Sequence, residues 1–176
     1  QSTEQAIYFI GTPTLLNTPL TSSPQPLNLV TLFDIQYVRY DPDTNTLFWL
    51  DSLGEATLVV AQCSFFLNSA FIFFDTRFSS PPLFEPQGLM IRPSSTQLWI
   101  SQPSQIVSVN KINPNNISTP IVGTTGQFSN TGDGQLITSQ TFIDGPTAGV
   151  FDSLQNFFII ALSSNSMIRR ITTRGL

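Results

Sequence analysis

A strand–turn–strand pattern recurs three times along the chain, beginning near Phe33, Phe84 and Phe142. In each copy an apolar run leads into a turn of Pro, Asp, Asn or Ser residues, and a second apolar run follows. The copies are spaced by about 50 to 60 residues, which is near the period of several known structural repeats. On this spacing Trp49 and Trp99 occupy matched places. The pattern predicts an all-β chain made of repeated antiparallel units.

The last copy, with the run that precedes it, carries the most specific motif residues. A glycine closes an apolar run, a Gly-Asp-Gly loop follows, and Asp or Asn residues begin the later turns. Strand, loop, strand, turn and strand are the content of one four-stranded propeller blade. In detail the sequence resembles the NHL repeat at Gly123, Gly132, Asp133, Gly134, Phe142, Pro146, Gly149, Val150, Asp152, Asn156, Asn165, Ile168 and Arg169. The resemblance implies a β-propeller with NHL-like four-stranded blades.

We expect a single domain over residues 1–176 that contains about three such blades. The blades are predicted near residues 33–74, 84–123 and 142–176, with a Pro/Ser/Thr-rich irregular loop at 12–26. Strands are predicted near Ile7–Ile10, Tyr37–Tyr40, Leu47–Leu50, Thr57–Val60, Leu89–Ile91, Leu98–Ile100, Ile106–Val109, Ile117–Val122, Ala148–Phe151, Phe157–Ala161 and Met167–Ile171.

Three blades leave a propeller ring open, because closed rings contain about four to eight. The ring is therefore partial or is completed by other chains. The segment Ile7–Gly11 is similar to the run that ends at Gly123, so it has the character of a blade's edge strand. That strand could come from this chain, from an identical neighbour, or from a continuation of the chain. No signal peptide precedes Gln1, so we expect a mature or trimmed N-terminus.

Charged residues make up only 10% of the chain, and the net charge is −4 with seven basic residues. This balance argues against nucleic acid and anionic membrane as partners. The surface must instead be built from Ser, Thr, Asn and Gln, which suits a glycan coat or burial in a permanent assembly. The low-charge stretch Leu58–Phe74 is interrupted by polar residues, so we predict two strands around an Asn68-Ser69 turn and no membrane span.

The chain contains no histidine, which excludes Ser-His-Asp and Cys-His catalysis and the usual imidazole metal ligands. Lyases that resemble NHL propellers use histidines and zinc, which this chain cannot supply. We therefore predict no enzyme activity and assign no catalytic, cofactor-binding or metal-binding residue. Calcium could still bind the carboxylates of Asp41 with Asp43, or of Asp133 with Asp144 and Asp152. Turn formation is the favoured role for these aspartates.

Two further features have simple structural interpretations. Cys63 is the only cysteine, so it cannot form a disulfide within the chain. We expect a buried inert thiol, and an intermolecular bridge is the alternative. Arg169 and Arg170 could bind an anionic partner, but stem packing or an ion pair between blades is favoured for Arg169.

Together these features predict a non-enzymatic extracellular or cell-surface propeller subunit with a structural or interaction role, as in a glycosylated filament or surface assembly. Its expected partners are proteins, either further copies of itself or the rest of a longer chain, and an N-linked glycan. The alternative is a propeller enzyme or ligand-binding domain that uses Asp, Asn or calcium at the central channel.

The sequon Asn116-Ile117-Ser118 generates the first testable prediction. It follows a Pro-containing turn and should be exposed to the glycosylating enzyme. We expect Asn116 to carry an N-linked glycan in protein from its native source. Intact-peptide mass spectrometry tests this, and a wholly unmodified Asn116 would argue against secretion through a glycosylating pathway.

Overall fold

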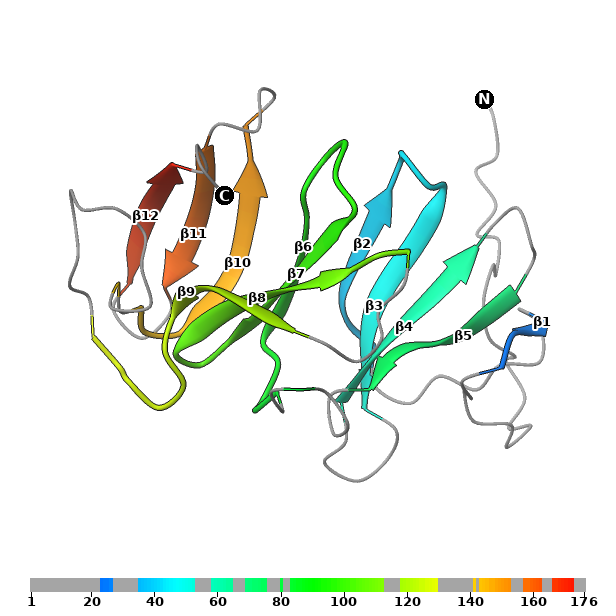
Figure 1. The fold of residues 1–176 in the computed structure, drawn as a ribbon, viewed down its shortest axis with the longest axis horizontal. Helices are drawn as coiled ribbons and strands as arrows, with labels where there is room; N and C mark the ends of the chain where they lie inside the picture. Colours follow the sequence, from blue (N-terminus) through cyan, green and yellow to red (C-terminus); the bar gives the residue numbers. More distant parts are fainter. Residues whose placement is uncertain are drawn as a thin grey trace, which may run out of the picture.

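The computed structural model describes residues 23–26, 35–52, 58–64, 69–75, 80, 83–112, 118–129, 141, 143–152, 157–162 and 166–172. Its regular elements are all β-strands (Figure 1). In chain order they are β1 (Gln25–Pro26), β2 (Ile35–Asp41), β3 (Thr46–Ser52), β4 (Leu58–Ser64), β5 (Ser69–Asp75), β6 (Gly88–Ile91), β7 (Gln97–Gln102), β8 (Gln105–Asn110), β9 (Thr119–Gly123), β10 (Pro146–Phe151), β11 (Phe157–Leu162) and β12 (Met167–Thr172). Within these residues no helix is long and apolar enough to cross a membrane.

The strands form three antiparallel sheets in which chain neighbours lie side by side. The first sheet has the order β1-β5-β4-β3-β2, the second β6-β7-β8-β9, and the third β10-β11-β12. None of the three closes on itself within the described strands. The all-β class predicted from the sequence is therefore confirmed.

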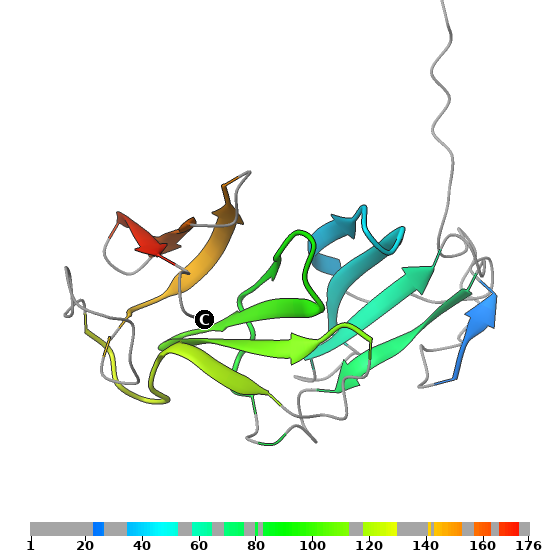
Figure 2. The ribbon, with the colours of Figure 1, turned by 45° about the horizontal axis from the view of Figure 1, so that its top comes forward.

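The leading strands of the three sheets are neighbours in space. Strand β6 contacts β2 of the first sheet and β10 of the third. Figure 1 and Figure 2 show the second sheet between the other two, with β2, β6 and β10 following one another across the molecule. The sheets thus succeed each other in space in the order in which they occur in the chain.

Residue burial follows from this arrangement, because the second sheet is covered on both faces. In β7, Leu98 and Ile100 point toward the first sheet, while Trp99 points toward the third. All three are fully buried. A strand that is covered on both faces needs apolar side chains at successive positions, which explains the unbroken run Leu98–Ile100.

Two apolar clusters fill the spaces between the sheets. The cluster between the first and second sheets contains Phe48, Leu50, Phe73, Phe74, Leu83, Leu89, Leu98, Ile100, Val107 and Val109. The cluster between the second and third sheets contains Met90, Trp99, Ile106, Val122, Ile143, Leu162 and Ile171. Edge-to-face ring contacts occur in both: Phe48 meets Phe73 at a centroid distance of 5.3 Å, and Trp99 meets Phe151 at 5.0 Å.

The prediction that Trp49 and Trp99 occupy matched places is wrong. Residues 42–45 connect β2 to β3 and residues 92–96 connect β6 to β7, so the second strand of each pair begins at Thr46 and at Gln97. Counted from the end of each turn, the third residue is Phe48 in one sheet and Trp99 in the other. Each of these two packs against the next sheet along the chain. Trp49 is buried on the opposite face of the first sheet, because alternate residues of a strand point to opposite faces.

The strand predictions in the described residues agree with the structure to within a few residues at each end. The low-charge stretch forms β4 and β5, as expected, and its residues 65–68 lie outside the described part. The predicted strand Ile7–Ile10 also lies outside it. Of the proline-rich segment 12–26 the structure describes residues 23–26, which include the two-residue edge strand β1. Prolines also occur in the edge strands β9 and β10, the position in a sheet where proline is usually found.

Gly88 begins β6, where this strand lies against β10 of the third sheet. A Cβ atom there would collide with the backbone oxygen of Thr147 in β10 and would lie 2.8 Å from Ser101 Oγ in β7. The backbone oxygen cannot rotate away, since it belongs to a strand. Only glycine therefore permits this approach of β6 to β10.

We predict that Gly88→Ala lowers the free energy of unfolding by about 2–3 kcal/mol, as expected for overpacking against backbone. Urea unfolding followed by circular dichroism measures the change. Gly126→Ala is the matched control: no atom lies within 4 Å of a Cβ there, and only its φ of +75° opposes the substitution. That strain should cost about 1 kcal/mol. Equal losses for both variants would refute the close-approach explanation.

Candidate functional site

A buried ion pair joins the first two sheets. Lys111, which follows β8, places its Nζ 2.7 Å from Oδ2 of Asp41 at the end of β2. The side chains are 2% and 0% exposed. A buried charge is costly unless it is paired and hydrogen-bonded, so each of these residues requires the other.

The Asp41 carboxylate has further partners in its own turn. Its Oδ1 accepts the backbone N–H of Asp43 at 3.2 Å, and its Oδ2 accepts the hydroxyl of Thr44 at 2.8 Å. This is the local hydrogen bonding by which aspartate initiates turns. The turn role predicted for Asp41 is therefore confirmed.

Asp43 uses its carboxylate elsewhere, because its Oδ2 accepts the backbone N–H of Ser94 in the β6–β7 turn at 2.6 Å. The backbone N–H of Lys111 in turn donates to the carbonyl of Thr96 at 2.6 Å. The β2–β3 turn, the β6–β7 turn and the end of β8 thus form one bonded unit, which we call the turn cluster (Asp41, Asp43, Ser94, Thr96 and Lys111). Asp41 and Asp43 therefore bind different protein groups. Across the described residues, no three His, Cys, Asp or Glu side chains gather as metal ligands would.

A hollow of about 420 Å³ lies beside the turn cluster and is open to solvent. It is lined by Arg92, Ser94, Ser95, Thr96 and Gln97, all of them polar. We call it the Arg92 hollow. Nothing in the sequence pattern singled out these residues, because a Pro-Ser-Ser-Thr turn after an arginine is ordinary turn composition.

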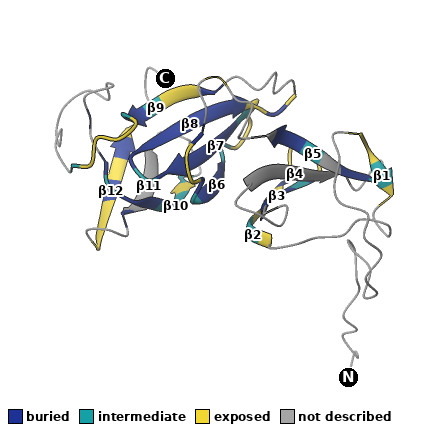
Figure 3. Ribbon diagram, turned by 90° about the horizontal axis from the view of Figure 1, so that it is seen from below, coloured by how far each residue is buried: buried dark blue, intermediate teal, exposed yellow. Residues whose placement is uncertain are grey.

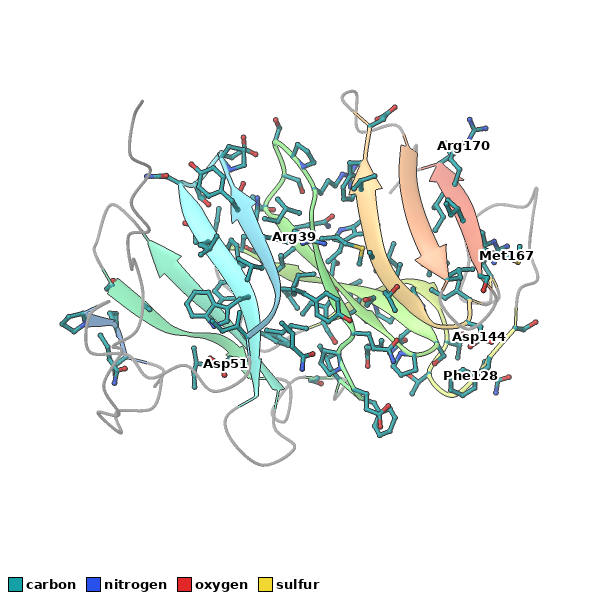
Figure 4. The ribbon with its side chains drawn as sticks, turned by 180° about the vertical axis from the view of Figure 1, so that it is seen from behind. Arg39, Asp51, Phe128, Asp144, Met167 and Arg170 are labelled. Atoms are coloured by element: carbon teal, nitrogen blue, oxygen red, sulfur yellow. The ribbon has the colours of Figure 1, made fainter. Side chains whose placement is uncertain are left out.

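The opposite end of the sheets is also polar but is closely packed. Gln102 Oε1 accepts the N–H of Phe84 at 2.6 Å, and the N–H of Gln87 donates to Ser101 at 2.8 Å. Gln87 Oε1, Ser101 Oγ and Gln102 Nε2 are buried without a partner. Figure 4 shows Asp51 and Asp144 toward this end, in the lower part of the view. These three atoms are inaccessible from outside, so they cannot contact a ligand.

Several predicted motif residues lie within strands or at their ends. Gly123 ends β9 with a φ of +87°, and a Cβ there would lie 2.7 Å from the Cα of Gln105. Pro146 begins β10, Gly149 lies within it, and Asp152 directly follows it. Arg169 lies in β12 with only 8% exposure, which agrees with the packed position favoured for it.

Other predicted residues lie outside the described part of the chain: Asn116, Gly132, Asp133, Gly134, Phe142, Asn156 and Asn165. The glycosylation site, the Gly-Asp-Gly loop and its calcium alternative thus stay predictions. Cys63 lies in β4 and pairs with Leu47 and Ala70, but its side chain is not described.

The third sheet exposes apolar side chains on its outward face, which points away from the second sheet. Val150 is 63% exposed and Ile168 is 77% exposed. Their equivalents in the second sheet, counted from the turns, are Met90 and Ile106, which are at most 1% exposed because the third sheet covers them. Figure 3 shows the exposed residues along β12 in yellow.

Comparison with models of known protein families and with curated proteins returns no match. The resemblance to NHL repeats therefore depends on the motif residues alone.

Sequence reasoning missed the most important partner of Asp41. Lys111 is 70 positions away in the chain, and no local pattern connects the two residues. The available signal was composition: the chain has a single lysine, which follows an apolar strand and has no acidic neighbour in sequence.

We predict that Lys111→Met lowers the free energy of unfolding by about 3–5 kcal/mol, because it leaves the Asp41 carboxylate buried without a cation. Asp41→Asn should cost a similar amount. The double variant should be much more stable than the sum of the two single losses implies, since it leaves no unpaired charge. Urea unfolding of all four proteins gives the coupling energy, and additive losses would show that the pair does not act as a unit.

Proposed function

We propose that this chain is a segment of a β-propeller with NHL-like blades and serves as a non-enzymatic structural or interaction subunit outside the cell. Each of the three sheets is one blade in this proposal. The support is that the sheets are antiparallel, follow chain order, and bring their leading strands β2, β6 and β10 together. Propeller blades have this organisation, with the first strand of each nearest the ring axis.

The observation that carries the interaction role is the outward face of the third sheet. Val150 and Ile168 occupy positions whose equivalents in the second sheet lie beneath a neighbouring sheet. Because Val150 and Ile168 are apolar, they too could be buried beneath a neighbouring sheet. A face of this type takes another sheet, because aliphatic side chains from two inner faces interdigitate when sheets pack.

The occupant that we propose is a second copy of the chain. Few charges oppose self-association, since only 10% of residues are charged. Two copies would supply six sheets, which is within the range of about four to eight for closed propellers. The join can be isologous or head to tail, and an unclosed head-to-tail join would extend into a filament.

A role outside the cell and without catalysis rests on the sequence. The chain lacks histidine, carries the Asn116 sequon, and has a polar uncharged surface composition. The turn cluster adds support, since the carboxylates of Asp41 and Asp43 hold the sheets together and are engaged with protein groups.

We predict that Ile168→Lys and Val150→Lys each weaken self-association about 10-fold or more, because a charge would have to be buried in the interface and an apolar contact would be lost. Light scattering coupled to size-exclusion chromatography, over a range of protein concentrations, measures the association constant.

Ile112→Lys is the matched control. Ile112 is 75% exposed, which is similar to Ile168, but it follows β8 in the second sheet and not the outward face of the third. It should leave association unchanged. A wild-type chain that stays monomeric at every concentration would overturn the choice of a second copy, and equal effects of all three variants would overturn the choice of face.

A further inference from the structure

The Arg92 hollow combines a cation with several hydrogen-bond donors and does not belong to the proposed assembly face. Arg92 follows β6, and its guanidinium makes one long contact, from Nη1 to Gln97 Oε1 at 3.5 Å. Its Nε is buried and has no partner. Among the described residues, Lys111 forms an ion pair with Asp41, and no carboxylate forms one with Arg92. Because the buried Nε cannot reach a ligand, the donors available to one are the four N–H groups on Nη1 and Nη2, one of which is shared with Gln97.

The other groups that line the hollow also have hydrogen-bond donors to which no acceptor is bonded. Gln97 Oε1 already accepts from Trp99 Nε1 at 3.3 Å as well as from Arg92, so the amide offers its NH₂ group to a ligand. Ser95 Oγ accepts the N–H of Gln97 at 3.1 Å and retains its own proton for donation. A ligand that fits this set must therefore supply acceptor oxygens.

The walls of the hollow are held in place before any ligand arrives. The N–H of Ser94 is bonded to Asp43, and the carbonyl of Thr96 is bonded to the N–H of Lys111. The turn that forms the hollow is thereby fixed to both the first sheet and the end of β8. Fixed donors bind more strongly than mobile ones, because less conformational entropy is lost on binding.

We propose that the Arg92 hollow binds the carboxylate of a small hydroxylated acid, such as a sugar acid. The planar guanidinium matches a carboxylate with two parallel hydrogen bonds. The hydroxyls of Ser94, Ser95 and Thr96 suit ligand hydroxyl groups, which both donate and accept. The hollow is shallow and largely open to solvent, so it would hold the acid group and adjacent hydroxyls of a ligand and leave the rest exposed.

The charge of the surroundings makes the site weak and salt-sensitive. The Asp43 carboxylate borders the turn through its bond to Ser94, and it repels an anion in the hollow. Asp41 does not add to this repulsion, because the Lys111 ammonium neutralises it at 2.7 Å. The proposal therefore makes two opposite predictions: removal of the Arg92 charge weakens binding, and removal of the Asp43 charge strengthens it.

The test is a titration of the full chain with sodium glucuronate at constant ionic strength, followed by the backbone amide NMR signals of residues 94–97. Arg92→Gln should raise the dissociation constant about 10- to 100-fold, as expected for hydrogen bonds to a charged group. Asp43→Asn, which keeps an acceptor for Ser94, should lower it about twofold to threefold, as expected for one screened nearby charge. The same spectra report whether each variant is folded.

Arg39→Gln is the matched control, since it removes the same charge from β2, where Nη1 of Arg39 is bonded to the carbonyl of Val38. It should leave the dissociation constant unchanged. Acetate that shifts the same signals would show that the carboxylate suffices, and a response to glucuronate alone would show that the sugar hydroxyls contribute. Equal responses to glucuronate and neutral glucose, no response to any probe, or equal effects of Arg92→Gln and Arg39→Gln would overturn the proposal.

Discussion

Every residue of β7 from Leu98 to Gln102 is buried, and this two-sided burial of the second sheet determines how the rest of the chain is arranged. A sheet with two apolar faces is unstable in water unless both are covered, because exposed apolar area costs about 25 cal/mol per Å². The first and third sheets supply those covers. The same requirement then applies to the third sheet, whose outward face is apolar at Val150 and Ile168.

Apolar faces alone leave the alignment of two sheets poorly determined, since dispersion contacts have little directional preference. The buried pair of Lys111 and Asp41 fixes the position of one sheet relative to the other at the end of the interface between the first two sheets. Such a pair contributes modestly to net stability, because the desolvation of both charges offsets their attraction. Its larger effect is on specificity: any sliding of the sheets would leave two charges buried and unpaired.

Much of the fold could be predicted from the sequence, because turns with Pro, Asp and Asn separate apolar runs of strand length. The faces of the strands were harder to predict. A run such as Leu98–Ile100 is apolar at every position, so its alternation does not reveal which residue points to which sheet, and Trp49 was matched to Trp99 for that reason. The partner of Asp41 could not be predicted, because it lies in a separate sheet. The Arg92 hollow could not be predicted because it is lined by a single turn of ordinary composition. Only the lone lysine hinted at the first of them.

The burial of Lys111 also gives the protein an unusual chemical surface. The chain has no other lysine, so its lysine amine is enclosed between two sheets. Reagents and enzymes that act on lysine, including acylating labels, aldehyde fixatives and lysine-directed proteases, meet no accessible side-chain amine while the sheets stay together. Acylation of Lys111 would therefore require their separation. The rate at which Lys111 is acylated would therefore measure how often the interface between the first two sheets opens.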